Sequence, residues 1–476
     1  KKWNLRSAVE EVKTYWDKPP EGKYIPYQEF VAYSVGGIGV NTINSLFGYV
    51  ALTANCLLLG SAYQIAPMDL AIMSIVMSIL NLVKTPFISM LVDNTNTKYG
   101  KFRPYLLITG VPTAALLILM AFIPNSLSYP LKCTMLSLIY ALLMIFQSLY
   151  ALAFTSLAQV LTPNGEERTG LLSVSQFIYS LGPSIVNLFF PILAGLFAGG
   201  MTGFTAYRTL FPIFSVFGII LSLWTFKGTE EKIVVPRNYV AKVRFVDGIS
   251  EIKSNKYFWL MTLYNVLGGL KGGIGGILAW YCIYVVRSDA VLGVMNAVIG
   301  TASVPGMLLA PLLAKKIGKR SSLIWFNLLR AGFAGLMLVT TKSPFLFLAC
   351  LYLSTAAIGG DGVMVSAMTA DVFDYQQWKT GKRLEGFITQ FSGMLVTAAT
   401  MLFNLILPWF YEHYGLEKDY TVLFQEAVRT PIFNIMIITT VISCLAAVIP
   451  ILFYDMTEKK QAEIIADLKE RAEAEI

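Results

Sequence analysis

The sequence predicts an all-α membrane protein with about twelve transmembrane helices. These helices are expected to form two pseudo-symmetric bundles of six. Three observations support this fold class. Of the 476 residues, 55% are apolar and only 14% are charged, which is typical of chains that lie in lipid. Apolar stretches long enough to cross a hydrocarbon layer of about 30 Å recur along the whole chain. The loops between them repeat a basic pattern after six spans.

The expected spans are apolar stretches that contain few charges. They cover residues 28–60, 68–92, 104–124, 131–160, 170–198, 204–226, 257–286, 290–314, 321–341, 344–370, 385–411 and 430–454. Glycines and prolines interrupt several of them, most densely between Gly268 and Gly276. In membrane helices such residues allow close packing, or local unwinding beside a cavity.

Basic loops predict the orientation and the domains. About 28 of the 37 lysines and arginines fall in the N-terminus, the loops after even-numbered spans and the C-terminus. Because basic loops stay on the cytoplasmic side, both termini are expected in the cytoplasm. The expected location is the inner membrane of a bacterial cell. The expected parts are a cytoplasmic N-terminal segment, an N-terminal bundle, a cytoplasmic linker, a C-terminal bundle and a cytoplasmic tail. They cover residues 1–27, 28–226, 227–256, 257–455 and 456–476. The linker and the tail are expected to contain amphipathic surface helices.

The two halves contain similar loops at corresponding places. Span 2 ends in Gly100-Lys-Phe-Arg103, and span 8 ends in Lys315-Lys-Ile-Gly-Lys-Arg320. Span 4 ends near Glu166-Glu-Arg-Thr-Gly170, and span 10 is followed by Lys382-Arg-Leu-Glu-Gly386. Basic cytoplasmic loops occur in any membrane protein, but matching glycines indicate an internal duplication. Such a duplication is typical of transporters whose two halves rock about a site near the bilayer midplane.

Several other classes of protein are not supported. The net charge of +8 comes from short loops and is no nucleic-acid surface, so no nucleic-acid partner is expected. The five cysteines are scattered, and His413 is the single histidine, so neither a disulfide framework nor a metal site is predicted. No cleavable signal peptide is visible. No nucleophile–base set or phosphate loop is present, so we expect no enzyme and no cofactor.

Two motifs make a family recognisable. The first runs from Asp93 to Tyr105, with Lys98-Tyr-Gly-Lys-Phe-Arg-Pro104 at its centre. The second is Thr369-Ala-Asp-Val-Phe-Asp-Tyr375 followed by Lys382-Arg-Leu-Glu-Gly386. Together they resemble the loops of the glycoside–pentoside–hexuronide:cation symporters, the branch of the major facilitator superfamily that includes melibiose permease. The resemblance implies the major facilitator fold and transport of a sugar-like solute with a cation.

The chain departs from that family where the cation binds. In sodium-coupled members, carboxylates on helices one, two and four bind the cation and the sugar. Matching the motifs puts Asn41 at the first of these places and Ala151 at the third. The helix-two pattern Asp-x-x-Asn-Asp-Pro becomes Asn81-Leu-Val-Lys84-Thr85-Pro86, so Lys84 replaces the asparagine of this cation site. Three more positions also differ. Where the family has a tryptophan next to the helix-four acid, an arginine on helix five and a lysine on helix eleven, this chain has neutral residues. These are Thr155, Gln176 and Thr397.

Four ionisable residues lie near the centres of their spans, namely Lys84, Lys271, Arg330 and Asp361. An isolated charge there costs about 3 kcal/mol, so each needs a partner or a wet cavity, and residues of this kind are functional by default. The set is positive overall, which favours an anionic ligand over sodium. Two alternatives remain: Arg330 and Asp361 form a structural ion pair, or Lys271 only faces a hydrated cavity.

Neutral polar residues near Lys84 could bind hydroxyl groups. Asn81, Lys84 and Thr85 share one helix face, as do Asn41 and Asn44. Tyr264 is a candidate for stacking on a sugar ring. The alternatives are ordinary hydrogen bonds between helices for the polar residues and an interfacial position for the aromatic one.

A separate charged set is expected at the cytoplasmic exit, where opposite charges could pair in one state and separate in the other. It comprises Asp93, Lys101, Arg103, Arg168, Asp371, Asp374, Lys382, Arg383 and Glu385. The alternative is ordinary surface charge, since exposed pairs are worth less than about 1 kcal/mol each.

These patterns predict a secondary active or facilitative transporter of a glycoside or of an acidic sugar derivative such as a hexuronide, not coupled to sodium in the usual way. A neutral-sugar or amphiphile carrier, with Lys84 only replacing the cation, is one alternative. A non-transporting membrane receptor is another. The expected partners are the small-molecule solute and the lipid bilayer, with a proton left open, and the chain is expected to be a monomer.

Overall fold

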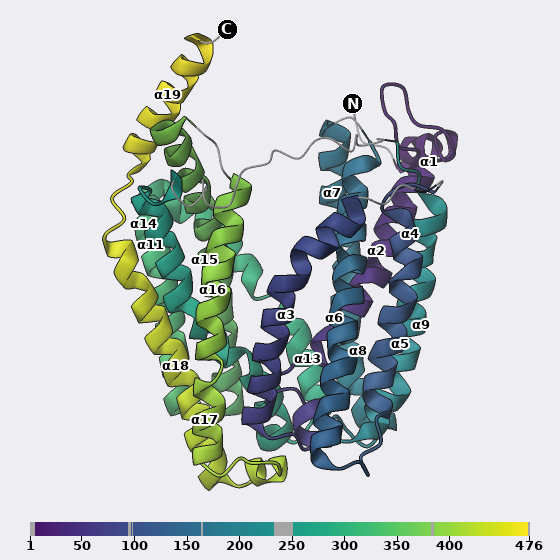
Figure 1. The fold of residues 1–476 in the computed structure, drawn as a ribbon, viewed down its shortest axis with the longest axis vertical. Helices are drawn as coiled ribbons and strands as arrows, with labels where there is room; N and C mark the ends of the chain where they lie inside the picture. Colours follow the sequence, from purple (N-terminus) through teal and green to yellow (C-terminus); the bar gives the residue numbers. More distant parts are fainter. Residues whose placement is uncertain are drawn as a thin grey trace. The chain divides into compact units, whose positions relative to one another are not determined.

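The computed structural model describes residues 5–93, 97, 99–162, 165–232, 251–381 and 385–474. The chain divides into two compact units. Unit 1 comprises Lys1–Ile65, Val76–Tyr239 and Ser288–Gly293, and unit 2 comprises Ala66–Ile75, Val240–Arg287 and Val294–Ile476. Helices make up both units (Figure 1).

The helices that precede the linker are α1 (Leu5–Thr14), α2 (Tyr27–Gly48), η1 (Leu58–Ala62), α3 (Pro67–Asp93), α4 (Arg103–Ile108), α5 (Gly110–Phe122), α6 (Tyr129–Val160), α7 (Gly165–Tyr179), α8 (Leu181–Phe197) and α9 (Phe204–Gly228). In this set α2 packs against α9, α7 and α8, and α5 packs against α6 and α9. Glycines allow the closest approach: a Cβ on Gly39 would lie 2.2 Å from the carbonyl oxygen of Gly218.

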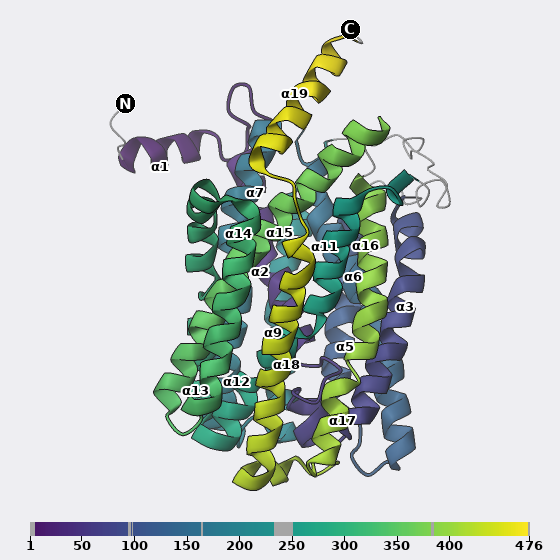
Figure 2. The same cartoon turned by 90° about the vertical axis from the view of Figure 1, so that its left-hand side faces the viewer.

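The helices after the linker are α11 (Lys256–Leu267), η2 (Gly268–Gly276), α12 (Ile277–Trp280), η3 (Tyr281–Val286), α13 (Asp289–Gly300), α14 (Ser303–Thr340), α15 (Pro344–Thr380), α16 (Glu385–Phe403), α17 (Ile406–His413), η4 (Tyr420–Phe424), α18 (Glu426–Leu452) and α19 (Glu458–Ala474). In unit 2, α14 packs against α15 and α18, and α11 packs against α16 and α18. Figure 2 shows α19 following α18 at the end of the chain.

Ten helical stretches of the described residues are long and apolar enough to cross a membrane. One of them, Asp289–Thr340, contains two expected spans. Gly318 lies between these two spans and interrupts α14 with φ +81°. The glycine-rich helix α2 is not among the ten. The all-α membrane architecture is therefore confirmed.

Some elements differ in their limits from the expected spans. The first span ends as an α-helix at Gly48, well before residue 60. The third, fifth and eleventh are each divided into two helices, and the seventh changes from α to 3₁₀ geometry at Gly268–Gly276, where glycines were expected to interrupt it. The tail forms α19, while most of the linker in which a surface helix was expected lies outside the described residues.

The two halves repeat one arrangement at the turn before their third spanning helix. In unit 1, Glu231 accepts hydrogen bonds from the backbone amides of Lys101, Phe102 and Arg103, at 2.7, 2.7 and 2.8 Å. In unit 2, Glu458 accepts one from the amide of Lys319 at 2.6 Å. Each carboxylate comes from the segment that follows the last membrane-spanning helix of its own half, α9 or α18.

The arginines of the two turns correspond as well. The Arg103 guanidinium donates to the carbonyl oxygen of Phe226, at the end of α9. The Arg320 guanidinium donates to the carbonyl oxygens of Ile451 and Leu452, at the end of α18. The internal similarity predicted from the loops thus extends to individual hydrogen bonds.

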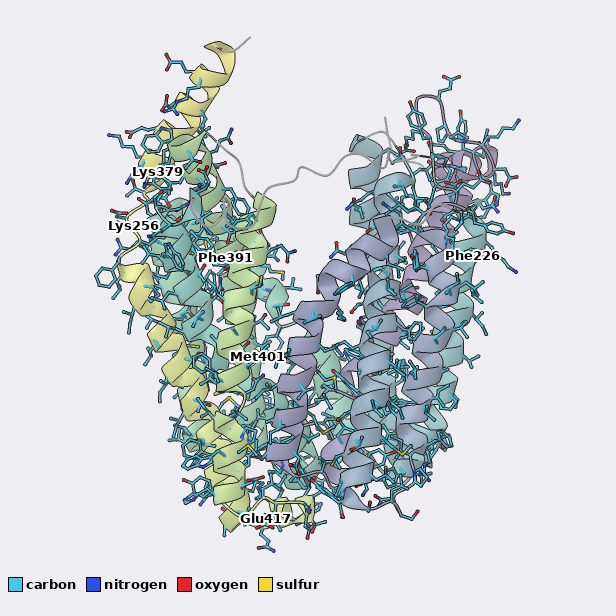
Figure 3. All side chains as sticks on the ribbon, viewed as in Figure 1. Phe226, Lys256, Lys379, Phe391, Met401 and Glu417 are labelled. Carbon is cyan, nitrogen blue, oxygen red and sulfur yellow. The ribbon has the colours of Figure 1, made fainter. Side chains whose placement is uncertain are left out.

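Figure 3 shows where the side chains lie along the helices. Lys256 and Lys379 lie at one end of unit 2, whereas Glu417 lies at the other. Phe391 and Met401 lie between those ends, along α16.

Candidate functional site

The central break in the seventh span gives unit 2 its polar centre. The sequence Gly268-Gly-Leu-Lys-Gly-Gly-Ile-Gly-Gly276 forms the 3₁₀ segment η2 between α11 and α12. Glycine weakens an α-helix by about 1 kcal/mol per residue and permits other backbone geometry. The segment therefore leaves α-helical geometry where Lys271 lies.

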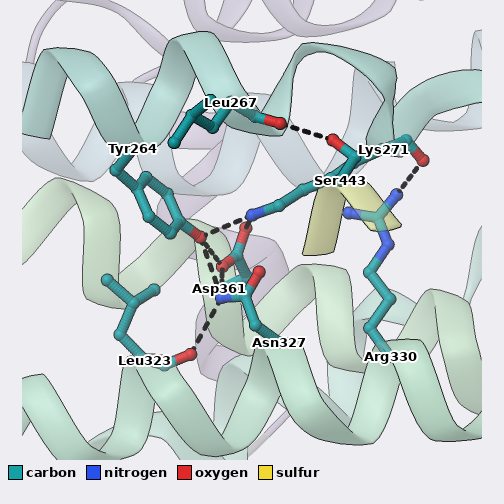
Figure 4. Close-up of polar contacts among 8 residues, drawn as sticks. All are labelled: Tyr264, Leu267, Lys271, Leu323, Asn327, Arg330, Asp361 and Ser443. Carbon is teal, nitrogen blue, oxygen red and sulfur yellow. Dashed lines mark hydrogen bonds and ion pairs between the residues drawn. The ribbon is translucent and has the colours of Figure 1, made fainter. Parts of the chain in front are cut away.

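Figure 4 shows a connected set of polar side chains around Lys271. The Lys271 ammonium donates to the Tyr264 hydroxyl at 2.8 Å and lies 3.8 Å from Oδ2 of Asp361. The Tyr264 hydroxyl donates to Oδ1 of Asp361. Asn327 donates through Nδ2 to the same Oδ1 at 2.8 Å and to the tyrosine oxygen at 2.9 Å. Three helical segments and η2 thus meet at one carboxylate.

Arg330 does not pair with Asp361. Its Nη2 donates to the carbonyl oxygen of Lys271 at 2.6 Å, and its Nε has no hydrogen-bond partner among the described residues. The ion pair of Asp361 is instead formed with Lys271, although the Arg330–Asp361 pair was the alternative considered from the sequence. The positive charge of Lys271 is therefore balanced, whereas Arg330 faces a neutral acceptor.

Lys84 forms a second buried site, in unit 1. Its ammonium donates to the carbonyl oxygen of Met144 at 2.8 Å and to the hydroxyl of Ser148, both on α6. The residue is 7% exposed. Among the residues that the structure describes, Lys84 forms no ion pair with a carboxylate.

Within the described part of the chain, the hydrogen bonds of Lys84 go to Met144 and Ser148 and to none of the other predicted polar residues of unit 1. Asn41 donates to the carbonyl oxygen of Gly37 within its own helix, and Asn44 accepts from Gln147 at 3.1 Å. Asn81, Thr85, Thr155 and Gln176 are exposed in unit 1, where the hydroxyls of Thr85 and Thr155 bond to carbonyl oxygens of their own helices.

A cavity of about 570 Å³ lies within unit 2, between α11, α15 and α16, and it contains Thr397. Its volume is in the range of small-molecule sites. Its polar lining consists of neutral donors and acceptors: Thr262, Asn265, Thr369, Thr389, Ser392 and Thr397. Apolar side chains such as Phe258 and Met261 cover the rest. Such a lining can bind hydroxyl groups beside an apolar ring face.

The described members of the charged exit set bond within their own units. Arg103 contacts α9, as given above, and Lys101 lies over the ring of Phe102. Asp371 is buried and pairs with Lys319 at 2.7 Å, and Asp374 lies one turn further along α15. The rest of the predicted set lies outside the described residues: the side chains of Asp93, Arg168 and Glu385, and the whole of Lys382 and Arg383. Charge pairing at the exit stays a prediction.

Some polar residues of the two sites could not be distinguished, from the sequence alone, from other polar residues of membrane helices. Asn327 and Ser148 are neutral residues inside long apolar spans, where hydrogen bonding between helices is the common role of such side chains. Their one distinguishing feature is register. Asn327 lies three residues before Arg330 on α14, which puts both on one helix face.

Known proteins resemble this chain over most of its length. The family model described as "MFS/sugar transport protein" matches residues 32–458. The isoprimeverose transporter of Lactiplantibacillus pentosus is 24% identical over 77% of this chain and 76% of its own. The glucuronide carrier protein homolog of Escherichia coli (strain K12) is 25% identical over 81% and 84%. A bacterial homologue of the iron transporter ferroportin, solved in an inward-facing state, has the same fold, with a TM-score of 0.63 at 14% identity over 90% of this chain and 98% of that one.

Proposed function

Because this chain belongs to the MFS/sugar transport family, we propose that it carries a glycoside or an acidic sugar derivative across the bacterial cytoplasmic membrane by alternating access. Transport proceeds without the carboxylate-bound sodium ion of cation symporters. The protein is a transporter and not an enzyme, because its relatives are transporters.

The observation that carries this proposal is the environment of Lys84. Sodium binds carboxylate, carbonyl and hydroxyl oxygens, and an ammonium at the same place would repel it. Lys84 already holds a carbonyl and a hydroxyl oxygen of α6. Its ammonium acts as a tethered internal cation, at the cation-site position of helix two where the family resemblance gives an asparagine next to an acid.

The preference for an acidic solute rests on the balance of buried charge. Lys271 is paired with Asp361, but among the described residues Lys84 and Arg330 donate to neutral oxygens. A carboxylate on the solute would offset the cost of keeping these cations out of water. The glucuronide carrier protein homolog among the relatives agrees with this preference.

A neutral glycoside is the second candidate, and the unit 2 cavity favours it. The side chains that line this cavity are all uncharged. The isoprimeverose transporter is a relative whose name gives a solute without an acidic group. In this case Lys84 replaces the coupling cation and makes no contact with the solute.

Uptake by the purified protein in proteoliposomes tests both the preference for an acidic solute and the independence from sodium. The probes are radiolabelled methyl β-D-glucuronide and methyl β-D-glucoside, each supplied with an inward sodium gradient and with choline in its place. We expect counterflow of at least one probe, preference for the glucuronide, and equal rates with sodium and choline. Strong stimulation by sodium would reject the tethered-cation role. Preference for the glucoside would select the neutral alternative, and binding of either probe without counterflow would indicate a receptor.

A further inference from the structure

We propose that Asp361 binds the proton that is carried with the solute, and that Lys271 and η2 respond when it is bound. The inference rests on the proposed transport function and adds the coupling ion to it. It concerns unit 2 alone, whereas the cation-site positions discussed above lie on helices of the N-terminal half.

The two oxygens of Asp361 are in different situations. Oδ1 accepts hydrogen bonds from Tyr264 and Asn327. Oδ2 faces the Lys271 ammonium at 3.8 Å, which is too long for a direct hydrogen bond. Oδ2 therefore has room for a proton, while Oδ1 is held by two donors from α11 and α14.

The surroundings bury the carboxylate without sealing it. The side chain of Asp361 is 15% exposed and that of Lys271 is 8% exposed. The titratable and charged groups near Asp361 come from every element around it: Tyr264 from α11, Lys271 from η2, Arg330 from α14 and the Cys444 thiol from α18. Lys271 is the single cation paired with Asp361 among the described residues.

Proton binding changes the charge of this group by one and breaks no covalent bond. A proton from water adds to Oδ2, and the carboxylate becomes a neutral acid. The Lys271 ammonium then loses its counter-charge while it stays buried, and an uncompensated buried charge is strongly unfavourable. Lys271 is driven to move away from Asp361.

The backbone at Lys271 allows such a movement. The residue belongs to the 3₁₀ segment η2, in which Gly272 and Gly275 have no atom within 4 Å of a built Cβ. Arg330 binds the carbonyl oxygen of Lys271, and η2 packs against α18, so displacement of η2 reaches α14 and α18. A single protonation is thus transmitted to the helices that pack against η2.

Infrared difference spectroscopy on the full-length protein in lipid tests proton binding without any solute. Because the chain has 29 Asp and Glu residues, acidification should produce several carboxylic-acid carbonyl bands, and one titrating component should be missing from Asp361→Asn. In Lys271→Met this component should persist to higher pH than in wild type, because the acid has lost its cation. The matched control is Asp455→Asn: a hydrogen bond from Lys256 lowers the pKa of Asp455 to about 2, so its removal should leave this component in place. Identical titrating carbonyl spectra for wild type and Asp361→Asn would overturn the proposal.

Transport assays then connect the proton to the solute. With a pH-sensitive dye inside proteoliposomes, addition of the transported methyl glycoside should acidify the lumen in wild type and not in Asp361→Asn. The variant should lose accumulation driven by a pH gradient, and this loss should be larger than any loss of counterflow, which needs no net proton movement. Accumulation that persists in Asp361→Asn overturns the proposal. If neither methyl glycoside is transported by wild type, the proposed substrate class fails, while the infrared result still decides whether Asp361 binds a proton.

Discussion

Lys84 and Lys271 show two ways of keeping an ammonium inside a membrane protein. Lys271 has a carboxylate at 3.8 Å, whereas Lys84 has a carbonyl and a hydroxyl oxygen. A charge at the centre of a membrane helix costs about 3 kcal/mol, and neutral acceptors recover only part of that cost. A buried lysine that has only neutral acceptors, as Lys84 has, is better explained by a role in transport than by a contribution to stability.

Replacement of Lys84 by methionine should therefore separate transport from folding. Ser148 already donates to the Met144 carbonyl at 2.7 Å, so removal of the ammonium leaves no acceptor stranded. We expect the thermal unfolding midpoint to stay the same or rise, and uptake to fall at least about tenfold, equivalent to about 1.4 kcal/mol of lost coupling. Uptake and unfolding are measured on the same proteoliposome preparation.

Lys132→Met is the matched control for this residue. Lys132 is also buried, and it bonds to Asn125 at 2.6 Å and to the carbonyl oxygen of Tyr63, near the start of α6. Its replacement should lower stability and leave the uptake rate per folded molecule unchanged. Normal uptake by Lys84→Met would assign Lys84 to structure alone.

At the scale of elements, glycines determine how closely helices can pack. Across α14 and α15 a Cβ on Gly306 would lie 1.9 Å from the carbonyl oxygen of Ala356, and one on Gly359 would lie 1.9 Å from that of Ser303. Backbone atoms cannot move aside as a flexible side chain can. The pair is therefore held together by small residues, as is common in membrane helices.

Gly306→Ala should force α14 away from α15. We expect a loss of about 1–3 kcal/mol, the usual cost of overpacking, measured as a lower unfolding midpoint in detergent. Gly332→Ala, also on α14, is the control, because nothing lies within 4 Å of its built Cβ and alanine favours the helix. Equal midpoints for the two variants would contradict the close packing.

The carboxylate clamps at the two corresponding turns allow a second test at this scale. Glu231→Gln keeps the shape but removes the charge from three charge-assisted hydrogen bonds to backbone amides. We expect a loss of about 1–2 kcal/mol, in the range of helix-end caps. The neighbouring residue Glu230 is exposed, so Glu230→Gln should be neutral, and an equal loss there would reject the clamp.

At the scale of the molecule, composition and periodicity were sufficient to predict an all-α membrane protein with a duplicated pattern. They also predicted the glycine break in the seventh span, because clustered glycines are a strong local signal. They did not predict that Asp361 pairs with Lys271 and not with Arg330. That choice depends on the rotation of α14 and on the 3₁₀ geometry of η2, neither of which can be read from spacing.

The predicted orientation remains to be tested on the whole molecule. Lys379 and Glu417 lie at opposite ends of unit 2 (Figure 3). In a background without native cysteines, Glu417→Cys should react with a membrane-impermeant maleimide in intact cells, and Lys379→Cys only after the cells are broken. The reverse pattern would place the termini outside the cytoplasm.

Since Glu231 and Glu458 each follow the last membrane-spanning helix of their own half, each fragment of a gene divided after Lys232 would keep its own clamp. Two separately translated polypeptides should then associate in the membrane and restore uptake. A division placed just before Glu231 would remove that carboxylate from the first fragment and should complement poorly. The duplicated turn thus predicts where this transporter tolerates being made in two pieces.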